Sequence, residues 1–368
     1  MANNHSEPLV SVIVGARPNF VKVARLIPAL RGIGVQTRLI HTGQHYDERM
    51  SQAFFEDLDI PRPDINLGIG SGTHIWQITE VMRQLEQEFA TIRPQAVLVV
   101  GDVNSTLAAT LTACKLDIPV GHVEAGLRSF DRTMPEESNR ILTDAISTWL
   151  FTSEPAANEN LANEGVAPER IHFVGNVMID TLLFNLEKAR LAKSYEQFSL
   201  QPHQYVVLTL HRPSNVDNVE RLGSILAAVA EIASVFPVLL PVHPRTRKRL
   251  EEFEGQVRLD PNRVHVVEPQ GYLAMLGLMD AARFVMTDSG GVQEETTALG
   301  VPCLTLRENT ERPVTVHQGS NQIVGWRTAD IVNAAKTVER TRRNGQVPMH
   351  WDGATSSRIA NVLKRAIN

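Results

Sequence analysis

The stretch Leu9-Val-Ser-Val-Ile-Val-Gly-Ala-Arg-Pro-Asn-Phe-Val-Lys22 indicates how the fold begins. Residues 9–14 form a short apolar run, and a Gly-Ala-Arg-Pro turn follows directly. Residues 20–30 then carry apolar side chains at helical spacing, and Gly32 and Gly34 are stop signals. Because short runs of this kind are typical of strands buried on both faces of a parallel sheet, the stretch predicts a strand, a turn and a helix.

The same alternation continues along the chain. Further strands are predicted at 37–41, 96–100, 120–123 and 149–152, with helices at 73–89 and 105–115. The pattern then restarts, with a helix at 219–236 and strands at 205–210, 238–242, 264–267, 284–287 and 303–306. This predicts an α/β fold with two Rossmann-like domains, 1–175 and 176–368, which face a central cleft. The final helix can pack back on the first domain.

The composition excludes several classes of protein. The 368 residues include 36 basic and 41 acidic ones, and the formal charge of −5 argues against a surface that coats nucleic acid. A local basic pocket for a small anion remains compatible with this charge. Two distant cysteines, Cys114 and Cys303, exclude a disulfide scaffold and a cysteine-based zinc site. With no membrane-length apolar run and no signal peptide, we expect a soluble, cytoplasmic protein without nucleic-acid or membrane partners.

A second strand-turn-helix stretch, Met286-Thr-Asp-Ser-Gly-Gly-Val-Gln-Glu-Glu-Thr-Thr-Ala-Leu-Gly300, suggests a phosphate or diphosphate cradle. Ser289, Gly290 and Gly291 lie in the turn, where the backbone can approach a ligand closely, and a helix begins near Val292. Glu295, one helical turn further, is placed to accept hydrogen bonds from ribose hydroxyls. The alternative is a purely structural turn in which the two glutamates complement the helix dipole.

The first turn offers cations for the same kind of ligand. Arg17 and Lys22 lie beside the predicted helix start, where they suit a phosphate or diphosphate. The alternative is an ordinary helix start, with Pro18 in the first turn and two solvated cations.

Three acidic residues end successive strands or open the following helix. They are Asp102 in Val100-Gly-Asp-Val-Asn-Ser-Thr106, Glu124 in Gly121-His-Val-Glu-Ala125, and Glu136 in Met134-Pro-Glu-Glu-Ser-Asn-Arg140. Carboxylates that share a site shift each other's pKa values apart, so one can serve as acid and another as base. For Asp102 and Glu136 the alternative is a helix cap or first-turn acid. Glu124 is harder to explain in this way, because Glu is unusual at the end of an apolar strand.

His211, in Leu208-Thr-Leu-His-Arg-Pro-Ser-Asn215, ends the first strand of the second domain. A histidine there can bind a phosphate or transfer a proton, and the alternative is a structural histidine. No His-x-x-x-His or Asp-rich array points to a metal site.

In combination, these motifs resemble the non-hydrolysing UDP-N-acetylglucosamine 2-epimerases. Gly15-Ala-Arg-Pro-Asn-Phe-Val-Lys22, the three carboxylate motifs, the His211 motif, Thr287-Asp-Ser-Gly-Gly-Val-Gln-Glu-Glu295 and Thr310-Glu-Arg-Pro313 occur in the family's order. The resemblance implies the fold shared with GT-B glycosyltransferases, a homodimer in the bacterial cytoplasm, and no nicotinamide or metal cofactor. It also implies that UDP-GlcNAc and UDP-ManNAc interconvert, through elimination of UDP to a 2-acetamidoglucal and its re-addition.

The resemblance assigns roles residue by residue. Asp102, Glu124 and Glu136 match the catalytic carboxylates, without showing which one deprotonates C2, and His211 matches the histidine near the diphosphate. Arg17, Lys22 and Arg312 match substrate-binding cations. The remaining matches are to the diphosphate turn (Ser289, Gly290, Gly291), the ribose acid (Glu295) and the uridine pocket (Gln270, with Met275 where some members carry Phe).

Several related activities stay open from the sequence. A hydrolysing 2-epimerase would release ManNAc and UDP, and another relative would act on a modified sugar such as a UDP-diacetamido-uronic acid. Arg312 and Pro313 favour the plain substrate over the modified one. A GT-B glycosyltransferase would need an acceptor site and has little use for three carboxylates. A UDP-sugar sensor would gain nothing from a costly acidic cluster.

Overall fold

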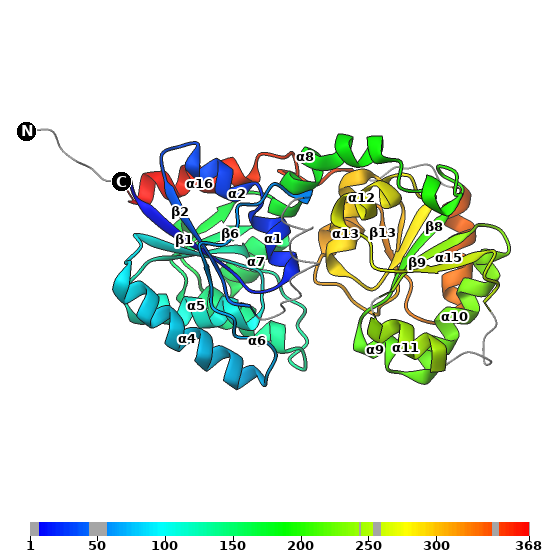
Figure 1. Ribbon diagram of the computed structural model, residues 1–368, viewed down its shortest axis with the longest axis horizontal. Coiled ribbons are helices and arrows are strands. Elements are labelled where there is room, and N and C mark those ends of the chain that lie inside the picture. Colours follow the sequence, from blue (N-terminus) through cyan, green and yellow to red (C-terminus); the bar gives the residue numbers. More distant parts are fainter. Residues whose placement is uncertain (1–6, 44–56, 243, 253–258, 341–345, 368) are drawn as a thin grey trace, which may run out of the picture. The chain divides into compact units, whose positions relative to one another are not determined.

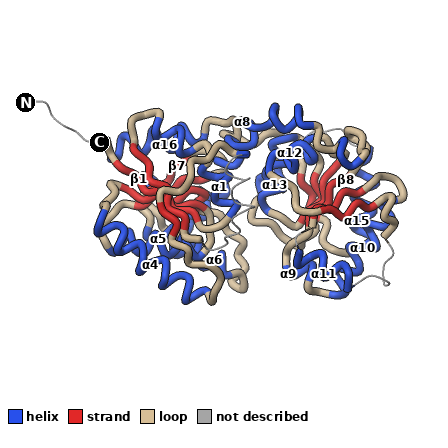
Figure 2. Tube along the Cα trace, in the orientation of Figure 1, coloured by secondary structure: helices blue, strands red, loops and turns tan. Residues whose placement is uncertain are grey.

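The computed structural model of the chain describes residues 7–43, 57–242, 244–252, 259–340 and 346–367. Its residue contacts define two compact units, Met1–Leu183 with Met349–Asn368, and Phe184–Pro348. Each unit is a parallel sheet between layers of helices (Figures 1 and 2). The two-sheet α/β architecture predicted from the alternating pattern is confirmed. The predicted boundary between 175 and 176 stays a prediction, and the two units divide within a helix at 183.

The first unit has a seven-stranded sheet in the order β3-β2-β1-β4-β5-β6-β7. Its strands are β1 (Leu9–Val14), β2 (Gln36–His41), β3 (Ile65–Asn66), β4 (Ala96–Val100), β5 (Val120–Ala125), β6 (Trp149–Thr152) and β7 (Ile171–Phe173). Its helices are α1 (Arg17–Val23), α2 (Leu26–Arg31), α4 (His74–Thr91), α5 (Asn104–Lys115), α6 (Pro135–Ile146), α7 (Pro155–Asn163), α8 (Val177–Ala192, shared with the second unit) and α16 (Thr355–Ile367), with a 3₁₀ turn at Pro168–Arg170. Figure 1 shows α4, α5 and α6 on one face of this sheet and α1, α2 and α16 on the other.

The second unit has a six-stranded sheet in the order β10-β9-β8-β11-β12-β13. Its strands are β8 (Val206–Thr209), β9 (Val238–Pro241), β10 (Val264–Val267), β11 (Phe284–Thr287), β12 (Cys303–Thr305) and β13 (Asn321–Ile323). Its helices are α9 (Pro213–Val216), α10 (Val219–Ala233), α11 (Pro244–Glu252), α12 (Tyr272–Asp280), α13 (Gly290–Leu299), α14 (Pro313–His317) and α15 (Thr328–Arg340), with a 3₁₀ turn at Glu196–Phe198.

Both sheets reverse their strand order next to their first strand. In the first unit β1 lies between β2 and β4, and in the second β8 lies between β9 and β11. Loops at the carboxyl ends of strands on the two sides of such a switch point diverge and leave a crevice for ligands. The loops that follow β1, β4, β8 and β11 are therefore the candidate ligand-binding loops.

The helix expected at 20–30 is in fact two helices, α1 and α2, separated at Ala24 and Arg25. Pro28 lies in the first turn of α2 and has no N–H to donate to the carbonyl of Ala24, and its ring would clash with that carbonyl in a continuous helix. The edge strands β7 and β13 were not predicted, because each has only three residues and contains polar ones.

The chain returns to the first unit at its end, where α16 packs against α2. Asp180 of α8 accepts hydrogen bonds from the first backbone N–H groups of α16, on Thr355 at 3.1 Å and Ser356 at 2.6 Å. A carboxylate at that point satisfies amides that have no partner within the helix. The buried Trp351 adds a bond from its Nε1 to the Ser153 carbonyl at 3.0 Å.

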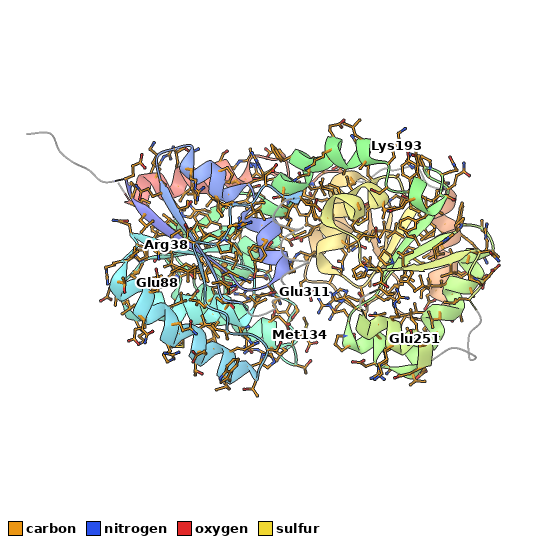
Figure 3. All side chains as sticks on the ribbon, in the orientation of Figure 1. Arg38, Glu88, Met134, Lys193, Glu251 and Glu311 are labelled. Atoms are coloured by element: carbon orange, nitrogen blue, oxygen red, sulfur yellow. The ribbon has the colours of Figure 1, made fainter. Side chains whose placement is uncertain are left out.

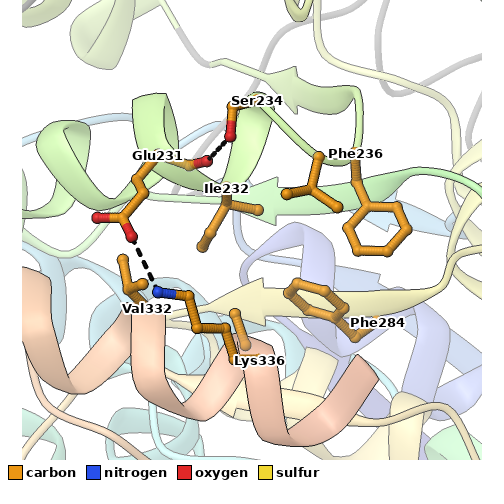
Figure 4. A pocket seen from close by; sticks show the side chains of 9 residues that line it. Glu231, Ile232, Ser234, Phe236, Phe284, Val332 and Lys336 are labelled. Atoms are coloured by element: carbon orange, nitrogen blue, oxygen red, sulfur yellow. Dashed lines mark hydrogen bonds and ion pairs between the residues drawn. The ribbon is translucent and has the colours of Figure 1, made fainter. Parts of the chain in front are cut away.

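Each unit has its own apolar core. In the first unit, Arg38 of β2 and Glu88 of α4 form an ion pair at 2.7 Å, and both residues are labelled in Figure 3. In the second unit an apolar cavity of about 120 Å³ lies between α10 and α15, with Phe236 and Phe284 in its wall (Figure 4). None of the predicted site residues lines it. Within the described residues, no helix is long and apolar enough to cross a membrane.

Candidate functional site

The loop after β1 is fixed to the neighbouring strand β4 by Asn19. Its Oδ1 accepts hydrogen bonds from the backbone N–H groups of Gly15 at 3.1 Å and Ala16 at 3.0 Å, and its Nδ2 donates to the Val100 carbonyl at 3.2 Å. The two loops of the first switch point are thus joined by one buried amide. Arg17 begins α1 at this point, and its side chain lies outside the described part of the structure.

Lys22 and Glu124 form a buried ion pair at this switch point. The Lys22 Nζ lies 2.6 Å from Glu124 Oε2, and the two side chains are 10% and 3% exposed. Gly101, directly after β4, lies beside them with a φ of 70°, and a Cβ there would lie 3.0 Å from Lys22 Nζ. Glycine adopts that backbone conformation without strain and leaves room for the Lys22 ammonium group. Lys22, predicted as a substrate-binding cation, is therefore held by a predicted catalytic carboxylate.

Asp102, next along the β4 loop, is paired with a different cation. Arg140 of α6 donates to Asp102 Oδ2 from Nε at 3.0 Å and from Nη2 at 2.6 Å, and from Nη1 to Glu137 Oε2 at 2.7 Å. Glu137 also accepts from the N–H groups of Ser129 and Phe130, each at 2.9 Å. Although burial raises the pKa of Glu137, these hydrogen bonds and Arg140 outweigh it and leave that pKa below its ordinary value.

Glu136, the third predicted carboxylate, lines a pocket of about 310 Å³ at the start of α6. Three amide side chains share its wall. Asn104 Nδ2 donates to Gln77 Oε1 at 2.7 Å, and Asn139 Nδ2 donates to the Asp102 carbonyl at 2.9 Å. The pocket therefore adjoins the loop that carries Asp102.

In the second unit, the corresponding switch point joins His211 to Asp288. The His211 Nδ1 lies 2.9 Å from Asp288 Oδ1, and Asp288 also accepts from the backbone N–H groups of His211 and Arg212. Burial raises the pKa of Asp288, but His211 and these N–H groups lower it by more, so that the pKa lies below its ordinary value. Asp288 is fully buried, whereas about half of the His211 side chain is exposed and accessible to a ligand.

The two glycines expected in the turn are instead the first residues of helix α13, because the helix begins two residues earlier than expected. Helix α13 starts at Gly290, with Ser289 as its N-cap residue, and the Ser289 N–H donates to Thr287 Oγ1 at 2.9 Å. Glu295 is buried on this helix, and desolvation together with the neighbouring Glu294 raises its pKa to about 8, against a hydrogen bond from Tyr272. At neutral pH its carboxyl group is mostly protonated, so it can donate a hydrogen bond as well as accept one.

Buried charges surround the loop that follows β12. Arg312 Nε donates to Glu294 Oε1 at 2.7 Å. Glu311, labelled in Figure 3, pairs with Arg307 at 2.8 Å and with Arg212 at 3.8 Å. Burial raises the pKa of Glu311, but Arg307 chiefly brings it down to about 2. Arg312, predicted as a substrate-binding cation, is thus already paired with a glutamate.

The two residues predicted for the uridine pocket lie near β10 and on α12. Gln270 donates from Nε2 to the Glu268 carbonyl at 2.7 Å and accepts from Gln197 at 3.5 Å. Met275 is half-buried on α12, where it packs against the core cluster around Tyr205 and Val207.

Several polar residues in these networks were not predicted as site residues. Arg140, Asp288 and Glu311 lie inside motifs singled out in the sequence. Arg140 and Asp288 each have a partner distant in the chain, Asp102 and His211, whereas Arg307 is only four residues from Glu311. Nothing in the local pattern distinguishes them from helix-surface or turn residues. Across the described residues, no cluster of three or more His, Cys, Asp or Glu side chains is arranged to hold a metal ion.

Comparison with known proteins identifies the family to which the chain belongs. The family model described as UDP-N-acetylglucosamine 2-epimerase matches residues 29–364. A UDP-N-acetylglucosamine 2-epimerase of Methanocaldococcus jannaschii is 43% identical over 360 residues, 96% of this chain and 98% of the relative. A UDP-2,3-diacetamido-2,3-dideoxy-D-glucuronate 2-epimerase of Pseudomonas aeruginosa is 42% identical over 363 residues, 97% of this chain and 99% of the relative.

Solved structures give the same result. The Methanocaldococcus jannaschii UDP-GlcNAc 2-epimerase in complex with UDP-GlcNAc and UDP superposes with a TM-score of 0.89 and 43% identity, over 97% of this chain and 99% of that one. The GT-B-like architecture expected from the sequence is therefore confirmed. From the family match across most of its length and the identity to its relatives, we conclude that this chain belongs to the UDP-N-acetylglucosamine 2-epimerase family.

Proposed function

We propose that the chain interconverts UDP-GlcNAc and UDP-ManNAc by non-hydrolysing epimerisation at C2. The observation that carries the proposal is the pair of carboxylates, Asp102 and Glu124, at the carboxyl ends of the adjacent strands β4 and β5. Each is held by its own cation, Arg140 at 2.6 Å and Lys22 at 2.6 Å. Proton removal and proton delivery at one carbon call for two such groups in fixed positions.

The proposed reaction is an elimination followed by an addition. A carboxylate removes the proton from C2, the C1–O bond breaks, and its electron pair leaves with UDP. The electrons of the former C2–H bond form the C1–C2 double bond of 2-acetamidoglucal. A carboxylic acid then protonates C2 on the opposite face while a UDP oxygen adds back to C1. The sequence of steps needs no electron donor or acceptor, so the proposal includes no nicotinamide. It also includes no metal, as the resemblance to the family implies.

The sugar chemistry is assigned to the first unit. Asp102, Glu124 and Glu136 are the proposed acid and base groups, and the pocket beside Glu136 offers amide groups suited to hydroxyl and acetamido substituents. Amides both donate and accept hydrogen bonds, as such substituents require. The structure favours none of the three carboxylates as the C2 base.

Nucleotide recognition is assigned to the second unit. The N-terminus of α13, with Ser289, Gly290 and Gly291, offers backbone N–H groups and the positive end of a helix dipole to a diphosphate. His211 adds an exposed imidazole, and the protonated Glu295 can donate to a ribose oxygen. The proposal also keeps Arg17, Lys22 and Arg312 as cations near the substrate and Gln270 and Met275 in the uridine pocket.

A homodimer in the cytoplasm completes the proposal. The free thiols of Cys114 and Cys303 support a reducing compartment, in which unpaired cysteines are the norm.

The decisive experiment is proton NMR of the purified protein with UDP-GlcNAc in D₂O. We expect deuterium to enter at C2 while UDP-ManNAc grows to a stable equilibrium. Free ManNAc and UDP accumulating without a plateau would instead establish the hydrolysing activity.

A second candidate substrate is a UDP-diacetamido-uronic acid, which the 42% identity to the Pseudomonas aeruginosa relative favours. Such a sugar carries a carboxylate at C6 and therefore needs a counter-cation. Arg312 and Pro313, in the Thr310-Glu-Arg-Pro313 motif, support the plain sugar. The same NMR experiment with the modified sugar decides between them, because C2 exchange should be faster with the true substrate.

A further inference from the structure

A fully buried histidine, His122, lies two residues before Glu124 on β5 and belongs to none of the roles above. Its Nδ1 lies 2.6 Å from Asp144 Oδ1, and its Nε2 lies 2.8 Å from the Gly101 carbonyl oxygen. A carbonyl oxygen cannot donate a hydrogen bond, and neither can an ionised carboxylate. When both bonds are made, the ring therefore carries a proton on each nitrogen.

Asp144, on α6, is the partner that makes this charge tolerable in the interior. Its second oxygen, Oδ2, accepts from the Gly126 N–H at 3.0 Å and lies 2.8 Å from Arg128 Nη1. Arg128 in turn donates to both oxygens of Glu164, each at 2.7 Å. Positive and negative groups alternate along this chain of side chains, so each buried charge has an opposite neighbour. Although burial raises the pKa of Asp144, His122 and Arg128 lower it below its ordinary value.

The residue between these bonds, Glu124, has a strained backbone. Its φ is 71°, in the left-handed region that residues other than Gly and Asn rarely adopt. The register of β5 against β6 also shifts between Val123 and Ala125. Such a conformation persists only where the surroundings enforce it. Asp144 bonds to His122 and to Gly126, which lie two residues before and two residues after Glu124, and so holds β5 on both sides of it.

The His122–Asp144 pair is also connected to the strand end that carries the other carboxylate, Asp102. His122 donates to the carbonyl of Gly101, the residue directly before Asp102, so one imidazole joins the end of β4 to β5. This buried hydrogen bond fixes the ends of β4 and β5, and with them Asp102 and Glu124, relative to each other.

We propose that His122, doubly protonated and paired with Asp144, is the positioning device that holds Glu124 in its left-handed conformation and fixes it relative to Asp102. His122 and Asp144 are fully buried behind the strand ends, so they are positioning residues rather than catalytic ones. For its effect on turnover, the inference rests on the proposed epimerase function.

The first test measures the protonation of the ring without any substrate. In the full-length protein labelled with ¹⁵N-histidine at pH 7, one slowly exchanging imidazole should show protons on both nitrogens, and it should disappear from the spectrum of His122→Gln. A spectrum in which that ring has an unprotonated nitrogen would overturn the proposal.

The second test measures turnover. His122→Gln and Asp144→Asn should lower kcat for C2 exchange roughly 10- to 100-fold and leave KM within about threefold, because misplaced carboxylates impair the transition state more than substrate binding. His172→Gln is the matched control, since His172 lies on β7 of the same sheet outside this network, and its kcat should match the wild type. A wild-type kcat in either network variant, or an effect confined to KM, would contradict the proposal.

Two further measurements keep the outcome decidable. If both variants fail to fold, Glu164→Gln at the partly exposed end of the network should still lower kcat about threefold with KM unchanged, and an unchanged kcat counts against the proposal. If the wild-type protein shows no C2 exchange with either UDP-sugar, the proposed function fails, whereas the ¹⁵N measurement still decides the protonation of His122.

Discussion

The ammonium group of Lys22 lies 2.6 Å from the Glu124 carboxylate, although 102 positions separate the two residues. Both side chains are buried at the switch point of the first sheet. The cation expected to hold the substrate is thus the partner of a carboxylate expected to perform the chemistry. Under the proposed function, one contact therefore serves both the stability of the first unit and the site.

Breaking this ion pair from either side should destabilise the protein. Lys22→Met or Glu124→Gln removes one charge and leaves the other buried without this ion pair, at a cost of about 3–5 kcal/mol. The double variant should cost less than the sum of the two, which a double-mutant cycle in urea measures. Arg83→Met, which breaks the exposed pair with Glu80, should cost under about 1 kcal/mol. Strictly additive effects of the two buried substitutions would contradict the contact.

The proposed acid and base groups should be necessary for turnover. Asp102→Asn and Glu136→Gln should each lower kcat for C2 exchange by about 10²- to 10⁴-fold, the usual contribution of a positioned proton-transfer group. Both variants should remain folded by circular dichroism. Glu159→Gln, on the exposed surface of α7, is the control and should be fully active. Wild-type turnover in either variant removes that residue from the proposed set.

His211 should act on UDP binding as well as on rate. His211→Asn removes the imidazole that faces solvent beside the buried Asp288, and we expect UDP affinity to fall about 10-fold and kcat with it. Calorimetric titration with UDP and the C2 exchange assay measure the two effects separately. His203→Asn, an exposed histidine of the same unit whose left-handed backbone asparagine tolerates, is the comparison. Kinetics and UDP affinity unchanged from wild type would make His211 a structural residue.

Glu295 should make the protein less stable as pH rises. Its pKa is about 8 in the folded state against an ordinary 4.5, so between these values the folded state binds more protons than the unfolded one. The free energy of unfolding therefore falls with pH, by about 1.4 kcal/mol per unit at most, and the full contribution is present only below 4.5. Glu295→Gln cannot ionise, so its stability relative to wild type should increase from pH 5 to pH 8. Urea unfolding at both pH values tests this, and a pH-independent difference would show that Glu295 titrates normally.

Gly175 should be essential for docking the returning C-terminal segment. Its φ is 99°, and a Cβ there would lie 2.1 Å from the carbonyl oxygen of His350. Gly175→Ala should therefore lower the thermal midpoint and expose residues near 350 to proteolysis. Gly165→Ala isolates the backbone strain, because Gly165 has a φ of 81° and no atom within 4 Å of its Cβ position. Equal losses in the two variants would rule out the steric contact as the cause.

Much of the fold could be predicted from local patterns. The strands at 9–14, 96–100, 149–152, 264–267 and 284–287 have the predicted bounds, because buried parallel strands are short apolar runs bordered by turns. The helix at 20–30 was wrongly predicted as continuous, because its apolar spacing outweighed the signal of Pro28. The edge strands β7 and β13 have only three residues each, too few to show a pattern, and they pair with β6 and β12.

The sequence by itself determined which chemistry-bearing residues end the strands, since strand-turn-helix motifs place Asp102, Glu124, His211 and the glycine turn at one edge of each sheet. Only the tertiary structure decided their partners: Lys22 with Glu124, Arg140 with Asp102, Asp288 with His211, and Glu294 with Arg312. The reason is physical. Local periodicity determines on which face of a sheet and at which end of a strand a residue lies. An ion pair depends in addition on how two elements pack, because that packing must bring the two charged groups to within about 3 Å. The left-handed backbone of Glu124 likewise follows from bonds to distant groups, and no local preference of glutamate would predict it.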